Sequence, residues 1–146
     1  MMFGNQLIYG TGLIIVMVIF HVIILMWLAA ILKRWEISYQ IFDSTFGTML
    51  AFGFSVFIII GIHTAEAWFW AYIYVALGEF SGIQDALYFS VATSTTLGYG
   101  DVVLSEQWRL LGSFEAMGGL LLFGASTAFL VGLMRYVFSD TNSGAG

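Results

Sequence analysis

The segment TLGYGD, residues 96–101, occurs once in the chain and lies between two long apolar stretches, 47–77 and 108–138. Directly before it comes a shorter apolar stretch, 83–96, which is too short to cross a bilayer and is therefore a candidate re-entrant segment. A third long apolar stretch, 7–32, precedes all of these. Each long stretch reaches the roughly 20 residues that a membrane-spanning helix needs. The sequence therefore predicts an all-α membrane protein with three transmembrane helices, a re-entrant helix and a loop.

The composition also indicates a membrane environment. Hydrophobic residues make up 60% of the chain and charged residues only 9%, which is too apolar for the surface of a soluble domain. Cysteine is absent, so disulfides and thiolate metal sites are excluded. The formal charge of −5 argues against a nucleic acid partner. We expect the lipid bilayer as partner and the cell membrane as location, or the bacterial inner membrane if the chain is prokaryotic.

The basic residues predict the orientation in the membrane. Lys33 and Arg34 end the first long stretch, and Arg135 lies near the end of the last one. Because Lys and Arg favour the cytoplasmic side, the N-terminus and the TLGYGD loop should lie outside and the C-terminus inside. The first helix has no repeated arginines and so is no voltage sensor. We expect it to pack around the helix at 47–77.

The glycines of the TLGYGD segment suit a site for a cation. A cation that has lost its water inside a membrane needs replacement oxygen ligands, and residues without a Cβ let successive carbonyls face one axis. The Thr96 hydroxyl would add to the carbonyl oxygens of Thr96, Leu97, Gly98 and Tyr99. One loop supplies one oxygen to each ring, so four chains should meet in a homotetrameric pore.

The span 86–101 resembles the pore helix and selectivity filter of potassium channels, and with the flanking helices the resemblance covers about the last two thirds of the chain. It implies passive conduction of K+ through a selectivity filter at residues 96–100, in which the backbone carbonyls of residues 96–99 bind the ion, with K+ as permeant ion and no other cofactor. On this basis, 1–46 is an extra transmembrane helix with a cytoplasmic linker. The pore domain (outer helix, pore helix, filter and inner helix) is then 47–138, and 139–146 is a disordered tail.

The resemblance also assigns supporting residues. Tyr99 should point away from the pore axis, where Thr93 could bond its hydroxyl, and Tyr88 should donate a hydrogen bond to Asp101. Glu66 is similar to a glutamate that braces the linker between the filter and the inner helix in some relatives.

A glycine pair lies near the hinge position of the family's inner helix. This pair, Gly118 and Gly119, serves as a gating hinge in one interpretation and as a site of close helix packing in the other, and the sequence favours neither.

Ionisable residues inside membrane helices need partners. His63 and Glu66 are three residues apart and share a helix face. A site with two histidines and one carboxylate would need a second histidine at the same depth, and His21 is the only other one. The sequence therefore does not predict a zinc site, and we interpret His21 as a hydrogen-bonded structural residue. For Glu66 and Glu115, either a bracing role or a proton-sensitive role behind the filter stays open.

Two other functions remain as alternatives. A poorly selective cation channel usually lacks the filter tyrosine or its neighbouring glycines, which this chain keeps. A non-conducting accessory subunit would not need an intact filter. An enzyme is not predicted, because the sequence shows no nucleophile and base pair and no phosphate-binding loop.

Overall fold

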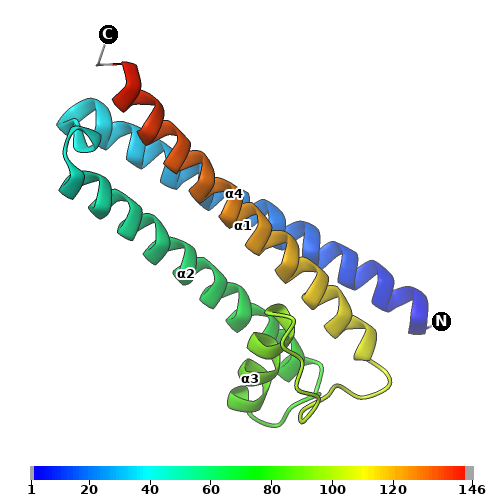
Figure 1. Ribbon diagram of the computed structural model, residues 1–146. Helices are drawn as coiled ribbons and strands as arrows, with labels where there is room; N and C mark the ends of the chain where they lie inside the picture. The colour runs from blue at the N-terminus through cyan, green and yellow to red at the C-terminus, as the bar shows by residue number, and fades with distance from the viewer. Residues whose placement is uncertain (1, 144–146) are drawn as a thin grey trace.

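The structure, a computed structural model, describes residues 2–143, and its regular secondary structure within them is all helical (Figure 1). The elements in chain order are α1 (Met2–Tyr39), the 3-10 turn η1 (Ile41–Asp43), α2 (Thr45–Ala76), α3 (Ile83–Ser94) and α4 (Arg109–Ser143). The all-α fold class predicted from the sequence is confirmed.

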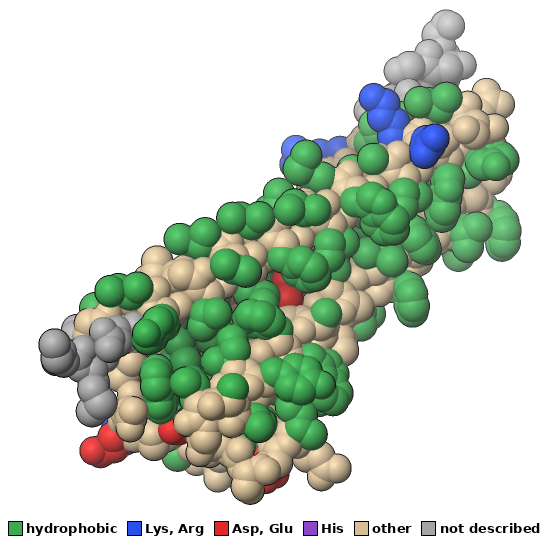
Figure 2. Space-filling view, turned by 180° about the vertical axis from the view of Figure 1, so that it is seen from behind, with side chains coloured by type: hydrophobic (Ala, Val, Ile, Leu, Met, Phe, Trp, Pro, Cys, Tyr) green, Lys and Arg blue, Asp and Glu red, His purple; other side chains and the backbone are tan. Residues whose placement is uncertain are grey.

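Three of these helices are long and apolar enough to cross a membrane: Gln6–Tyr39, Thr45–Ala76 and Arg109–Val137. Hydrophobic side chains cover the length of the molecule, with Lys and Arg gathered at one end and Asp and Glu mainly towards the other (Figure 2). The three predicted transmembrane helices are therefore confirmed, and the charge asymmetry used to predict their orientation exists in space.

The first two helices are separated by a tight turn. Helix α1 runs past Lys33 and Arg34, further than the predicted stretch 7–32, and the chain leaves it at Gln40, which has a left-handed φ of 49°. The Ser44 hydroxyl then caps α2 by accepting a hydrogen bond from the Gly47 amide at 3.0 Å. Residue 47 must be glycine here, because a Cβ would overlap the carbonyl of Ile41.

The last helix is longer than predicted. Helix α4 continues to Ser143, so residues 139–143 of the predicted disordered tail are helical. These five residues are polar, but they include no glycine or proline that would end a helix. Residues 144–146 lie outside the described residues.

Helix α1 packs mainly along α4 and only slightly against α2, which contradicts the expectation that it surrounds the second helix. The two helices lie side by side and run in the same direction (Figure 1). Gly118 of α4 lets them approach, because a Cβ there would lie 3.3 Å from Ile14 of α1. Lipid tails are as apolar as the side chains, so the hydrophobic effect does not select which helix faces pack together. Small residues, which let two helix backbones approach closely, then favour one pairing over another.

The short helix α3 lies between α2 and α4 at the end where the N-terminus is found (Figure 1). Its 12 residues extend over about 18 Å, less than the thickness of a bilayer core. It packs on an apolar core that includes Trp70, Tyr74 and Leu111. The chain leaves α2 and enters α4 at the same end of the molecule (Figure 1), as predicted for helices that flank a re-entrant segment.

Candidate functional site

The loop after α3 has an alternating backbone. Thr96, Gly98 and Gly100 have φ values of 59°, 51° and 77°, whereas Leu97 and Tyr99 between them do not have positive φ. A Cβ at Gly98 or Gly100 would meet no atom within 4 Å. The left-handed backbone, not crowding, is therefore what requires glycine. The same conformation is costly at Thr96, which has a β-branched side chain.

Backbone hydrogen bonds hold this loop on the end of α3. The Thr96 amide donates to the Thr93 carbonyl at 2.9 Å, and the Gly98 amide donates to the Ala92 carbonyl at 3.0 Å. The carbonyl end of α3 also carries the negative end of the helix dipole. This end lies against Gly119, about 15 Å along α4 from Arg109 by the helical rise, so the dipole ends well inside the membrane-spanning region.

The side chains of Leu97 and Tyr99 in the loop are solvent-exposed in the single chain. Leu97 is 55% exposed and Tyr99 is 69% exposed. Among the described residues no hydrogen bond joins Thr93 to Tyr99, so that contact stays a prediction.

Two contacts hold the outer side of the loop. Tyr88 donates to the Asp101 carboxylate at 2.8 Å, as predicted, and this hydrogen bond raises the pKa of Tyr88 above its ordinary value. The Glu79 carboxylate accepts from the amide and the hydroxyl of Ser105 at 2.6 and 2.8 Å. Glu79 therefore braces the segment between the loop and α4, the role that the sequence assigned to Glu66. Nothing in the spacing of Glu79 and Ser105 could have revealed this pair.

The glycine pair of α4 provides close packing in this conformation. A Cβ at Gly119 would overlap the backbone of Ser94 at the end of α3, and Gly118 lies against Ile14. Helix α4 is continuous through the pair. The packing interpretation accounts for both glycines, and a hinge at this position stays a prediction.

A buried carboxylate joins three helices behind the loop. Glu115 of α4 is fully buried. The hydroxyl of Tyr74 (α2) donates to it at 2.6 Å, and the hydroxyl of Ser90 (α3) donates to it at 2.5 Å. This geometry matches the bracing interpretation, because the short helix that carries the loop is bonded directly to its neighbours.

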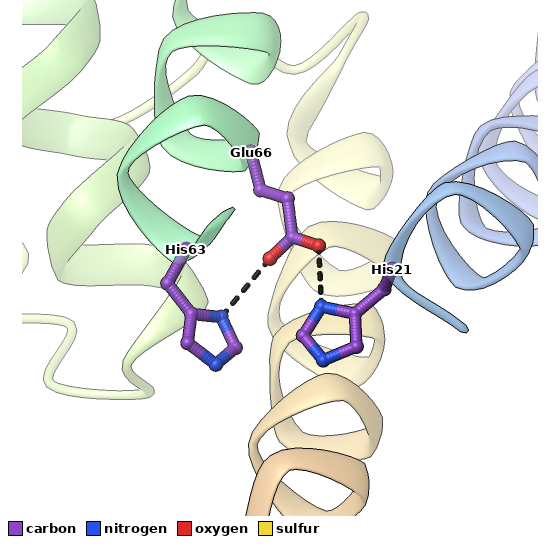
Figure 3. Close-up of side chains that lie close together, drawn as sticks. All are labelled: His21, His63 and Glu66. Atoms are coloured by element: carbon purple, nitrogen blue, oxygen red, sulfur yellow. Dashed lines mark hydrogen bonds and ion pairs between the residues drawn. The ribbon is translucent and has the colours of Figure 1, made fainter. Parts of the chain in front are cut away.

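A second buried carboxylate is held by both histidines (Figure 3). Nδ1 of His21 lies 2.8 Å from one Glu66 oxygen, and Nδ1 of His63 lies 3.0 Å from the other. Nε2 of each ring contacts the Ser126 hydroxyl, at 3.0 and 3.1 Å. The interpretation of His21 as a hydrogen-bonded residue is confirmed, and His21 is also the second histidine at the depth of His63 and Glu66, which the sequence did not predict. Because α1 packs along α4, the middle of α1 reaches the same depth as His63.

Residues 13–136 match a family model described as "Ion channel". The chain belongs to this ion channel family. The match begins within α1, so it extends further toward the N-terminus than the last two thirds covered by the resemblance noted in the sequence.

A curated relative supports the same family. The chain is 49% identical over 45 residues to two-pore potassium channel 1 of Arabidopsis thaliana, a match that covers 30% of this chain and 12% of that protein. This ion channel therefore aligns with about an eighth of its relative's length. The predicted resemblance to potassium channel pores is confirmed. No solved structure matches the chain.

Proposed function

We propose that this ion channel is potassium-selective and that residues 96–100 form its selectivity filter. The observation that carries the proposal is the alternation of left-handed residues at Thr96, Gly98 and Gly100. In an ordinary strand, successive carbonyls point to opposite sides, whereas alternating right- and left-handed residues bring them to the same side. A column of carbonyl oxygens of this kind replaces the water around K+. The name of the Arabidopsis relative supports the choice of ion.

The same proposal includes a homotetramer in the cell membrane. One loop provides a single column of oxygens, and a dehydrated cation needs a cage of them. Four chains around a cyclic axis complete the cage. The exposure of the loop supports this arrangement, as does the open face of α4, where Leu120 and Leu121 are 65% and 56% exposed.

The test is ion flux in liposomes that contain the purified protein. We expect flux driven by a K+ gradient and little flux driven by an equal Na+ gradient. Gly98→Ala should abolish selective flux, because alanine resists the left-handed backbone. Gly82→Ala is the matched control. Gly82 precedes α3 with a φ of −132° and has open space around it, so flux should persist.

Two results would count against the proposal. Equal K+ and Na+ flux through the unmutated protein would identify a poorly selective cation channel, and no flux of either ion would favour an accessory subunit. The mass of the conducting species checks the tetramer independently. Four chains of 16.2 kDa give about 65 kDa by cyclic assembly, and a smaller species in native mass spectrometry would rule the tetramer out.

A further inference from the structure

We propose that His21, His63 and Glu66 form a binding site for a divalent transition-metal ion, with Zn²⁺ as the representative ligand. The site is separate from the filter loop and does not depend on which ion the channel conducts. It would join α1, the helix added to the pore domain, to α2.

The donor atoms converge on one point. One ligand atom from each residue lies within 4.8 Å of the others, and both Nδ1 atoms face the same carboxylate (Figure 3). Ligands of a tetrahedral zinc are about 3.3 Å apart, from bond lengths of about 2.0–2.1 Å, so small side-chain rotations would bring the three atoms around an ion. Two imidazoles and a carboxylate are an established ligand set for zinc sites that keep one position open.

The hydrogen-bond pattern is incomplete without an added cation. An ionised Glu66 only accepts hydrogen bonds, so both Nδ1 atoms must carry their protons toward it. Both Nε2 atoms then carry no proton, and each directs a lone pair at the Ser126 hydroxyl. The Ser126 hydroxyl has one hydrogen and serves only one of them. One of the four contacts therefore lacks a proton.

A metal ion at the Nδ1 side removes this deficit. Each neutral imidazole then coordinates through Nδ1 and keeps its proton on Nε2. The Ser126 oxygen has two lone pairs and accepts from both rings. Metal-bound histidines typically donate their second ring proton to such an outer partner. The two Nε2 contacts with Ser126 match this arrangement, and bonds to the ion would replace the two Nδ1 contacts with Glu66. One imidazolium would also supply the missing proton, and the experiment below separates the two.

A cavity gives access to the cluster. It has a volume of about 320 Å³ and is lined by His63, Glu66 and residues of α3 and α4. The His21 side chain is fully buried, whereas that of His63 is 15% exposed. An ion would enter on the His63 side, where the cavity also has room for a water molecule as fourth ligand.

The experiment measures metal binding by the purified channel without a histidine tag. The protein is treated with a chelator and dialysed against zinc chloride, and bound zinc is determined by mass spectrometry. We expect one zinc per chain and a zinc-dependent rise in melting temperature, since an ion that binds only the folded state stabilises it. Cobalt(II) in the same site should give the strong visible absorption of a four-coordinate ion.

Variants locate the ion. Ser126→Ala should weaken zinc binding about 10- to 100-fold, the usual effect of losing an outer partner, and His63→Gln or Glu66→Gln should weaken it more. Glu115→Gln is the matched control, because Glu115 is equally buried but is bonded to hydroxyls, and it should leave zinc binding unchanged.

Either of two results would overturn the proposal. The first is a folded parent channel that binds no more zinc than magnesium and gives no four-coordinate cobalt spectrum, in which case the cluster holds a proton and not a metal. The second is zinc binding by His63→Gln equal to that of the parent, which would place the ion elsewhere. The parent measurement decides the first result even if a variant fails to fold.

Discussion

Glu115 and Glu66 are two buried carboxylates with different kinds of partner. Each links helices, and each lies almost entirely out of solvent. Glu115 is bonded to the hydroxyls of Tyr74 and Ser90, whereas Glu66 is bonded to the imidazoles of two histidines. A hydroxyl always has a proton to donate to a carboxylate, so each hydrogen bond in the Glu115 cluster has both a donor and an acceptor without any added ion. An imidazole nitrogen presents either a proton or a lone pair, so the Glu66 cluster accommodates a further cation.

The two clusters also differ in which helices they join. The Glu115 cluster includes Ser90 on α3, and its bonds therefore fix the helix that carries the loop at residues 95–101. The Glu66 cluster includes His21 on α1 and Ser126 on α4, and none of its hydrogen bonds reaches α3 or the loop. We infer that the first cluster supports the loop, whereas the second holds α1 to α2 and α4.

The largest predicted effect tests the Glu115 cluster. Glu115→Ala should lower the free energy of unfolding by about 3 kcal/mol or more, because it leaves two buried hydroxyls without an acceptor and adds a cavity. Glu115→Gln keeps an acceptor oxygen and should lose less than half as much. Thermal melting of the purified channel in detergent measures both. If the two variants melt alike, the hydroxyl bonds do not stabilise the fold.

A smaller effect tests whether the clusters are independent. Ser126→Ala should destabilise the metal-free channel by about 1–2 kcal/mol, because the Nε2 atom that accepts the Ser126 hydrogen loses its donor. The clusters share no residue, so Ser126→Ala and Glu115→Gln should be additive within about 0.5 kcal/mol.

The control for this measurement is Ser90→Ala combined with Glu115→Gln. Ser90 and Glu115 bond each other directly, so their effects should deviate from additivity by more than about 0.5 kcal/mol. Strong coupling between Ser126 and Glu115 would show instead that the two clusters act as one network.

Local features of the fold were predictable from the sequence. Stretches of apolar residues gave the three long helices, and the short length of 83–96 gave the re-entrant helix, because both follow from the thickness of a bilayer. The contact between Tyr88 and Asp101 followed from the family resemblance. These features depend on segments that are close in the sequence or on a motif that is read as a unit.

The contacts between distant helices were not predictable. His21 and Glu66 are 45 residues apart, and Glu79 and Ser105 are 26 apart. Soluble helices indicate their buried face by an apolar stripe, but a helix in lipid is apolar all round, so its sequence does not show which face meets a neighbour. The packing of α1 along α4 was not predicted for this reason. The cluster of His21, His63 and Glu66 was not predicted either, because it depends on that packing.

The smallest predicted effect compares a buried tyrosine and carboxylate pair with an exposed one. Tyr88 donates to Asp101 as Tyr74 donates to Glu115, but Tyr88 is 43% exposed and water competes for its bond. The bond to Asp101 raises the pKa of Tyr88, so the folded state favours the neutral phenol. This contribution to stability is complete below the ordinary tyrosine pKa of about 10. It disappears as the pH rises through the raised pKa.

Tyr88→Phe should therefore melt slightly below the parent at about pH 8, and the difference should vanish above the raised pKa of Tyr88. Tyr72→Phe, at another exposed tyrosine, controls for the loss of a surface hydroxyl. The measurement is melting temperature against pH for the parent and both variants. A loss for Tyr88→Phe as large as that for Glu115→Ala would contradict the comparison, because burial would then not be what makes a carboxylate and hydroxyl pair strong in this channel.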